Sequence, residues 1–274
     1  MEISNQEIDD IAEKIIKKYS KQFPVDPIEI AQSVGIEIIE GSRDYPFKGL
    51  IRRQDGIFYI ILNMHILENV NYSMCRYTIS HELGHYFIRH HRNKLKKGES
   101  IAFTGKDSAN PKKKMLEDQA QQFAASLLMP KSQFIKYFTQ IEETGFLSII
   151  RLKEHFNVSI TSATIRFTHL NLEPAISILW KDSEIINKGI SDSFREILNL
   201  DDVKIKLNLD RPKFEEEEVS NSKTGIRFYT SITPLSSWVH NVDKNWSNSF
   251  FVIEETFYCK HWNLTLLRPM NISK

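Results

Sequence analysis

The apolar residues of the N-terminal part follow first a helical and then a strand-like pattern. Apolar side chains recur every three or four positions at the start, and β-branched and aromatic residues dominate later. These patterns predict helices over 8–19 and about 27–34, and strands over 36–40, 47–53 and 56–63. The turn sequence Gln54-Asp55-Gly56 predicts a hairpin between the last two strands.

Helical spacing dominates from about residue 73 to residue 170, and strand-like spacing returns beyond Pro174. Strands are expected over 175–180, 203–209, 227–232, 249–258 and 262–269. This change of character predicts two domains, 1–171 and a β-rich domain 172–274, which together give an α+β fold class.

Two features of the C-terminal part are interpreted structurally. The acidic run at 215–218 is typical of a solvated loop or a helix end. The aromatic residues Trp238, Trp246 and Trp262 are expected in the core of the sheet. A sensor or partner-recognition role for this domain stays open.

Composition places the 274-residue chain among ordinary globular proteins, with 41% hydrophobic and 26% charged residues. The net charge of +1 gives no global field that would attract nucleic acid or a membrane. Cys75 and Cys259 cannot form a disulfide framework, which favours a reducing compartment. The N-terminus is acidic where a secretion signal is basic, and no stretch reaches about 20 apolar residues. A cytoplasmic protein without a membrane partner is therefore expected.

Residues 81–85 read HELGH, a spacing that suits a metal ion. On a helix, positions i and i+4 share one face, so His81 and His85 can reach the same ion. Glu82 lies about 100° further round the helix, where it can address a water molecule on that ion. An apolar stripe that includes Ile79 and Leu83 predicts the buried face, and both histidines point away from that stripe.

Neighbouring residues of this helix are assigned to packing. Cys75 lies on the apolar stripe and is interpreted as a small buried side chain. Tyr86 is a candidate donor to a developing oxyanion, but it also lies on the stripe, and packing is favoured.

A third ligand has two candidates. His91 stands ten residues after His81, but that arrangement needs a glycine at position 88, which is isoleucine here. His91 is therefore interpreted as a solvated residue. Glu117 falls on the apolar face of a helix predicted over 115–130, where a metal ion would compensate its burial. The residues alone leave two alternatives for Glu117. It is either a metal ligand or a carboxylate in the first turn of the helix, where the helix dipole favours a negative charge.

The segments RYTISHELGHYFI at 76–88 and EDQAQQFAASLLMP at 117–130 together resemble the ImmA/IrrE family of metallopeptidases, and the resemblance extends over about 24–170. It implies a zincin-like domain of gluzincin type with a helical segment. It also implies that His81, His85 and Glu117 bind zinc, for which manganese can substitute in vitro, and that Glu82 is the catalytic acid/base. Members of the family often have asparagine at the position of Gln121, which is expected to contact the metal ligands through hydrogen bonds.

The resemblance further implies a function. Family members are associated with the cleavage of helix-turn-helix repressors, which releases mobile-element or stress-response genes. The expected partner is therefore a protein substrate, namely a DNA-binding repressor. The alternative is a non-proteolytic regulator or toxin–antitoxin partner that keeps the fold and acts by binding protein or DNA.

Two further segments bear on binding. Residues 89–114 hold nine lysines and arginines against Glu99 and Asp107, and are interpreted either as a substrate-binding flap or as a solvated loop. Residues 152–170 resemble a helix-turn-helix, but the second helix offers only Arg166 and His169 as cations. Packing is favoured for this segment, and direct binding of nucleic acid is not expected.

Overall fold

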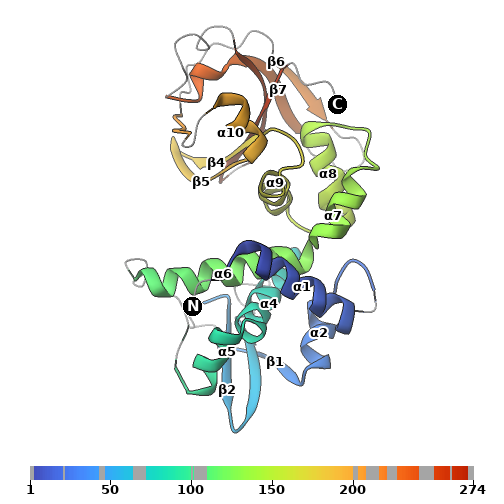
Figure 1. Ribbon diagram of the computed structural model, residues 1–274, viewed down its shortest axis with the longest axis vertical. Coiled ribbons are helices and arrows are strands. Elements are labelled where there is room, and N and C mark those ends of the chain that lie inside the picture. The colour runs from blue at the N-terminus through green and yellow to red at the C-terminus, as the bar shows by residue number, and fades with distance from the viewer. Residues whose placement is uncertain are drawn as a thin grey trace. The chain divides into compact units, whose positions relative to one another are not determined.

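The computed structural model describes most of the chain (Figure 1). The described residues are 3–20, 22–42, 47–63, 72–99, 101, 110–199, 203–207, 216–220, 227–240, 250–259 and 261–270. Helices and two sheets are both present, so the α+β class is confirmed. The chain forms two compact units, one of residues 1–136 with 154–159 and one of residues 137–153 with 160–274. The expected domain boundary after residue 171 remains a prediction.

The first unit contains the predicted helices and strands and one helix, at 89–96, that the pattern did not predict. They are α1 (Asn5–Tyr19), α2 (Pro27–Ser33), β1 (Ile36–Glu40), β2 (Gly49–Gln54), β3 (Ile57–Leu62), α4 (Tyr72–Phe87), α5 (Arg89–Lys96) and α6 (Pro111–Leu128). Helices α7 (Lys131–Phe138) and α8 (Gly145–Phe156) follow along the chain. Capping residues stabilise the N-termini of two of these helices. Ser4 and Glu7 form a capping box at α1, and Asn110 caps α6 directly before Pro111.

A three-stranded sheet with the order β1-β3-β2 lies beside these helices. Strand β3 pairs in parallel with β1 and antiparallel with β2. The predicted hairpin is confirmed, because Asp55 and Gly56 form a two-residue turn with positive φ values of 51° and 86°. Strand β2 therefore forms one edge of the sheet, and it packs against α4.

Helix α4 is buried around most of its circumference, since α2, α6 and β2 all pack against it. Ile79 and Leu83 lie in the core as predicted. Polar residues of the same helix are buried as well, and they have partners. Arg76 donates to the backbone carbonyls of Val25 at 2.7 Å and of Phe156 at 3.3 Å. The helix is thus the central element of the first unit.

The second unit is built on a six-stranded sheet with the order β5-β4-β9-β8-β7-β6. Its elements are α9 (Ile160–His169), β4 (Ile176–Lys181), β5 (Glu184–Ile190), α10 (Asp192–Leu198), β6 (Glu216–Ser220), β7 (Arg227–Pro234), the 3₁₀ turn η2 (Leu235–Ser237), β8 (Phe251–Tyr258) and β9 (Asn263–Pro269). Trp238 is fully buried and Trp262 is partly buried, whereas Trp246 lies outside the described residues. Arg166 is 1% exposed, which supports the packing interpretation of α9.

Three predictions for loops and strands need correction. The 89–114 segment is not one long loop, because α5 occupies 89–96 and α6 begins at Pro111; residues 100 and 102–109 lie outside the described part. The expected strand at 203–209 is reduced to a single bridge between Ile205 and Val239, with 208–209 outside the described part. The local alternation there had no full-length partner strand to pair with.

The acidic run is the third correction, since residues 216–218 open strand β6, while residue 215 lies outside the described part. Strand β6 is an edge strand, where charged side chains remain in solvent while β7 supplies the backbone pairing. Glu218 accepts a hydrogen bond from the Tyr229 hydroxyl at 3.1 Å. Within the described ranges, no helix is both long and apolar enough to cross a membrane.

Candidate metal centre

Helices α4 and α6 bring three predicted ligands together. Nε2 of His81 lies 3.2 Å from Oε2 of Glu117, and Nε2 of His85 lies 3.5 Å from Oε1 of the same carboxylate. One ligand atom from each of the three residues lies within 4.8 Å of the others. His85 is almost fully buried, whereas the side chains of His81 and Glu117 keep exposed fractions of 16% and 13%. The group therefore lies at the edge of the core, accessible from one side.

Gly84, the glycine of HELGH, allows the two helices to approach closely. A Cβ atom at this position would lie 3.1 Å from Cβ of Phe123 and 3.2 Å from Cα and O of Ala120. Such contacts are tighter than ordinary packing, so a side chain here would push α6 away. Ala120 is one helical turn beyond Glu117, and its small side chain serves the same approach. Close helix packing is thus the reason that the carboxylate reaches the imidazoles.

Glu82 lies between α4 and the edge strand β2. Its carboxylate Oε2 accepts a hydrogen bond of 2.8 Å from the backbone N–H of Ile51, and the residue is 5% exposed. Gly49 permits this contact, because a Cβ there would come within 2.4 Å of Cγ2 of Thr78. Strand β2 is an edge strand, so the N–H of Ile51 is free to hold one carboxylate oxygen in place.

A chain of hydrogen bonds continues behind His85. Nδ1 of His85 lies 3.0 Å from Nδ1 of His91, and Nε2 of His91 lies 2.9 Å from Oε1 of Gln119. Nε2 of His90 also lies 2.9 Å from that oxygen. If Nε2 of His85 binds a metal ion, its Nδ1 carries the proton and donates to His91, which then donates to Gln119. This series of hydrogen bonds therefore selects one tautomer of His85.

This arrangement corrects two expectations. His91 is not a solvated residue, because it is fully buried behind the predicted ligand His85. The side-chain amide that is hydrogen-bonded behind His85 belongs to Gln119, whereas Gln121 is exposed on the other side of α6. Gln119 was not identified and His91 was interpreted as solvated, because their burial depends on how α5 packs against α4, and α5 occupies a segment that looked like a polar loop.

The electrostatics favour an ionised carboxylate. Burial acts to raise the pKa of Glu117, but the hydrogen bonds from His81 and His85 lower it to about 2. For His81, burial acts to lower the pKa, yet the hydrogen bond to Glu117 and the charge of Glu82 raise it above the usual range. Burial and the neighbouring His85 lower the pKa of His91 to about 3, so His91 is neutral and able to accept a proton at Nδ1.

Tyrosines lie on both sides of the centre along α4. Tyr77, one turn before His81, has a pKa raised to about 12 by burial and by the charge of Glu117. Tyr86 packs edge-on against Phe58 with ring centroids 5.0 Å apart, in agreement with a packing role. Cys75 is partly buried against the core, and burial raises the pKa of its thiol. Tyr77 was not singled out by the helical pattern, because an isolated polar-aromatic residue carries no spacing signal.

The donor set fits a metal ion. Two imidazole nitrogens and one carboxylate oxygen match catalytic sites that keep one coordination position for water. Among the described residues, no further cysteine, histidine or acidic side chain joins these three ligands. The exposed edges of His81 and Glu117 provide access, and the chain from His85 to Gln119 supplies the hydrogen-bonded support that such ligands usually have.

Comparison with known proteins agrees with this reading. Residues 49–168 match the model of a peptidase family described as the IrrE N-terminal-like domain. A Mycobacterium tuberculosis transcriptional regulator of known structure is similar in fold, with a TM-score of 0.53 at 12% identity, over 97% of this chain and 90% of the other. At that identity the likeness concerns the fold alone. No curated protein matches the chain.

Proposed function

This chain belongs to the ImmA/IrrE peptidase family through its IrrE N-terminal-like domain, and on that premise we propose that it is a zinc-dependent endopeptidase of zincin-like, gluzincin-type fold. The observation that carries the proposal is the convergence of His81, His85 and Glu117 beside a buried, oriented Glu82. A purely structural zinc site is usually closed by four cysteine or histidine ligands and needs no such glutamate.

The residues divide the chemistry among them. Bound zinc would supply a Lewis acid that acidifies water and polarises a peptide carbonyl. Glu82 accepts a proton on its carboxylate and later returns it to the leaving nitrogen. The hydrogen bond from Ile51 holds one oxygen of Glu82, which leaves the other oxygen for proton transfer. His91 and Gln119 keep His85 in the tautomer that presents Nε2 to the metal.

The proposed substrate is a protein, namely a helix-turn-helix repressor whose cleavage releases the genes it controls. Support for this substrate class comes from the family resemblance. The near-neutral charge of the chain and the burial of Arg166 favour a protein substrate over direct DNA binding.

Glu82→Gln tests the mechanism. The variant is expected to bind zinc as the wild type does and to lose at least about 100-fold in cleavage rate, because the amide cannot accept the proton. Glu117→Gln is expected to lose both zinc binding and cleavage. Zinc content measured by mass spectrometry and cleavage of a helix-turn-helix repressor, followed on gels, separate the two effects. Asp118→Asn, an exposed neighbour on α6, is the control.

Normal cleavage by Glu82→Gln would contradict the proposal. A second outcome would favour the alternative of a non-proteolytic regulator. In that case the wild-type protein, loaded with zinc, would bind the repressor without cutting it, and Glu82→Gln would derepress the target genes as well as the wild type does.

A further inference from the structure

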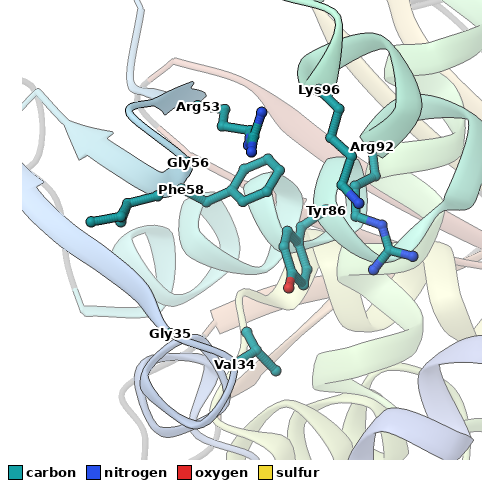
Figure 2. A pocket seen from close by; sticks show the side chains of 9 residues that line it. Val34, Gly35, Arg53, Gly56, Phe58, Tyr86, Arg92 and Lys96 are labelled. Carbon is teal, nitrogen blue, oxygen red and sulfur yellow. The ribbon is translucent and has the colours of Figure 1, made fainter.

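A second concave site lies in the first unit, lined by residues other than the proposed metal ligands. It is a pocket of about 360 Å³ between the end of α2, the β2–β3 hairpin, the end of α4 and helix α5 (Figure 2). Its lining residues are Val34, Gly35, Arg53, Gly56, Ile57, Phe58, Tyr86, Arg92 and Lys96. This volume is in the range of small-molecule sites and is several times that of a single phosphate group.

The charges in the pocket have one sign. Arg53 from the hairpin, and Arg92 and Lys96 from α5, all line it, and no acid does. Within the described part of the chain, none of these three cations forms an ion pair, although other basic residues nearby do; Lys94, for example, pairs with Glu99 at 2.8 Å. Bringing three positive charges to one cavity costs free energy that a bound anion would offset.

Arg92 gives an independent indication of a ligand. Its guanidinium lies over the ring of Tyr86, 5.4 Å from the centroid, which holds the side chain in place. Its Nε atom is buried and has no hydrogen-bond partner among the described residues. A buried N–H without a partner is unfavourable, so such groups usually indicate a ligand or water. An oxyanion would accept from it.

We propose that this pocket binds a small phosphorylated molecule, with the phosphate held by Arg53, Arg92 and Lys96. Arginine forks match the geometry of phosphate oxygens. Apolar side chains of Val34, Ile57 and Phe58 also line the pocket, and they suit the organic part of a phosphate ester rather than a free phosphate ion. The ligand class is therefore a phosphate monoester with a flat or apolar body, such as a mononucleotide.

Helix α5 connects this pocket to the metal centre. His91 faces His85, while the next residue, Arg92, lines the pocket; Tyr86 lines the pocket directly after His85. The binding proposal itself does not rest on peptidase activity, because it concerns charges and shape outside the ligand group. It can be tested on metal-free protein as well as on zinc-loaded protein.

The test is calorimetric titration of the full chain with AMP, inorganic phosphate and adenosine. AMP is expected to bind more tightly than phosphate, adenosine weakly, and the affinity for AMP to fall as salt rises. Arg92→Gln and Lys96→Gln are each expected to weaken AMP binding about tenfold or more. Arg52→Gln and Arg89→Gln, exposed residues that do not line the pocket, are the matched controls.

Several results would overturn the proposal. These are no heat with millimolar AMP, equal binding by Lys96→Gln and wild type, or equal loss in the two control variants. Binding of an acidic peptide through the same cations, without binding of AMP or phosphate, would also replace the proposed ligand class. Lys96 is exposed, so its variant is expected to fold, and circular dichroism spectra check the folding of Arg92→Gln.

Discussion

His85 illustrates how single residues act through their neighbours. Its Nε2 faces Glu117, while its Nδ1 contacts the buried His91, which in turn contacts Gln119. The pKa of His91 is lowered to about 3, so this side chain stays neutral at physiological pH and can accept the proton of His85. A protonated His91 would instead place a positive charge beside His85, which would oppose the binding of a cation there.

Removal of this support is expected to weaken zinc binding. His91→Ala and Gln119→Ala should each lower zinc affinity by about 10–100-fold, because the ligand loses its fixed tautomer and orientation. Competition with a chromophoric chelator measures the affinity. Gln121→Ala, which removes an exposed amide from the same helix, is expected to leave the affinity unchanged. An equal loss in Gln121→Ala would show that the hydrogen-bond chain is not the cause.

At the scale of elements, the spacing between α4 and α6 determines whether the ligands meet. Gly84 and Ala120 let the helix axes approach, and Gly49 lets strand β2 approach α4 from another side. The small residues thus position Glu117 and Glu82, although neither glycine has a side chain that could take part in chemistry.

Bulk at position 84 is expected to separate these helices. Gly84→Val should destabilise the protein by about 1–3 kcal/mol through overpacking, which exceeds the gain of less than about 1 kcal/mol in helix propensity. Zinc affinity should fall together with stability in Gly84→Val. Gly84→Ala should lower both stability and zinc affinity by a smaller amount. Urea unfolding and chelator competition measure both. Gln121→Val, on the exposed face of α6, is the control, and a fully stable, zinc-binding Gly84→Val would contradict the argument.

At the scale of the whole molecule, the proposed metal ligands all belong to the first unit, and the six-stranded sheet belongs to the second. The second unit has its own core, in which Trp238 donates from Nε1 to the buried Glu254 at 3.0 Å. A metal ion bound at this group would therefore directly stabilise contacts within the first unit only.

Zinc is expected to protect the two units unequally. At 1,000 times its dissociation constant, a ligand of the native state adds about 4 kcal/mol of stability. Hydrogen exchange read by mass spectrometry should show slower exchange in α4 and α6 on zinc addition, with β4, β8 and β9 little changed. Glu117→Gln should abolish the difference. Equal protection of both units, or protection that survives in Glu117→Gln, would place the ion elsewhere.

The local elements and the two-histidine motif follow from the order of residues alone. Helical and strand spacing and the Asp55-Gly56 turn act within a few residues of each other, so they can be seen without a fold. The spacing of HELGH likewise places two imidazoles on one helix face. Glu117 as the third ligand came from the family resemblance, since spacing alone left it open.

The side chains that surround that motif depend on long-range packing. His91 and Gln119 support His85, and Arg53 joins Arg92 and Lys96 around one pocket, because elements distant in sequence pack together. The acidic run at 216–218 became a strand because β7 was available as a partner, and 203–207 did not because only one bridge forms there. Burial and pairing depend on contacts across the fold, which a local pattern does not contain.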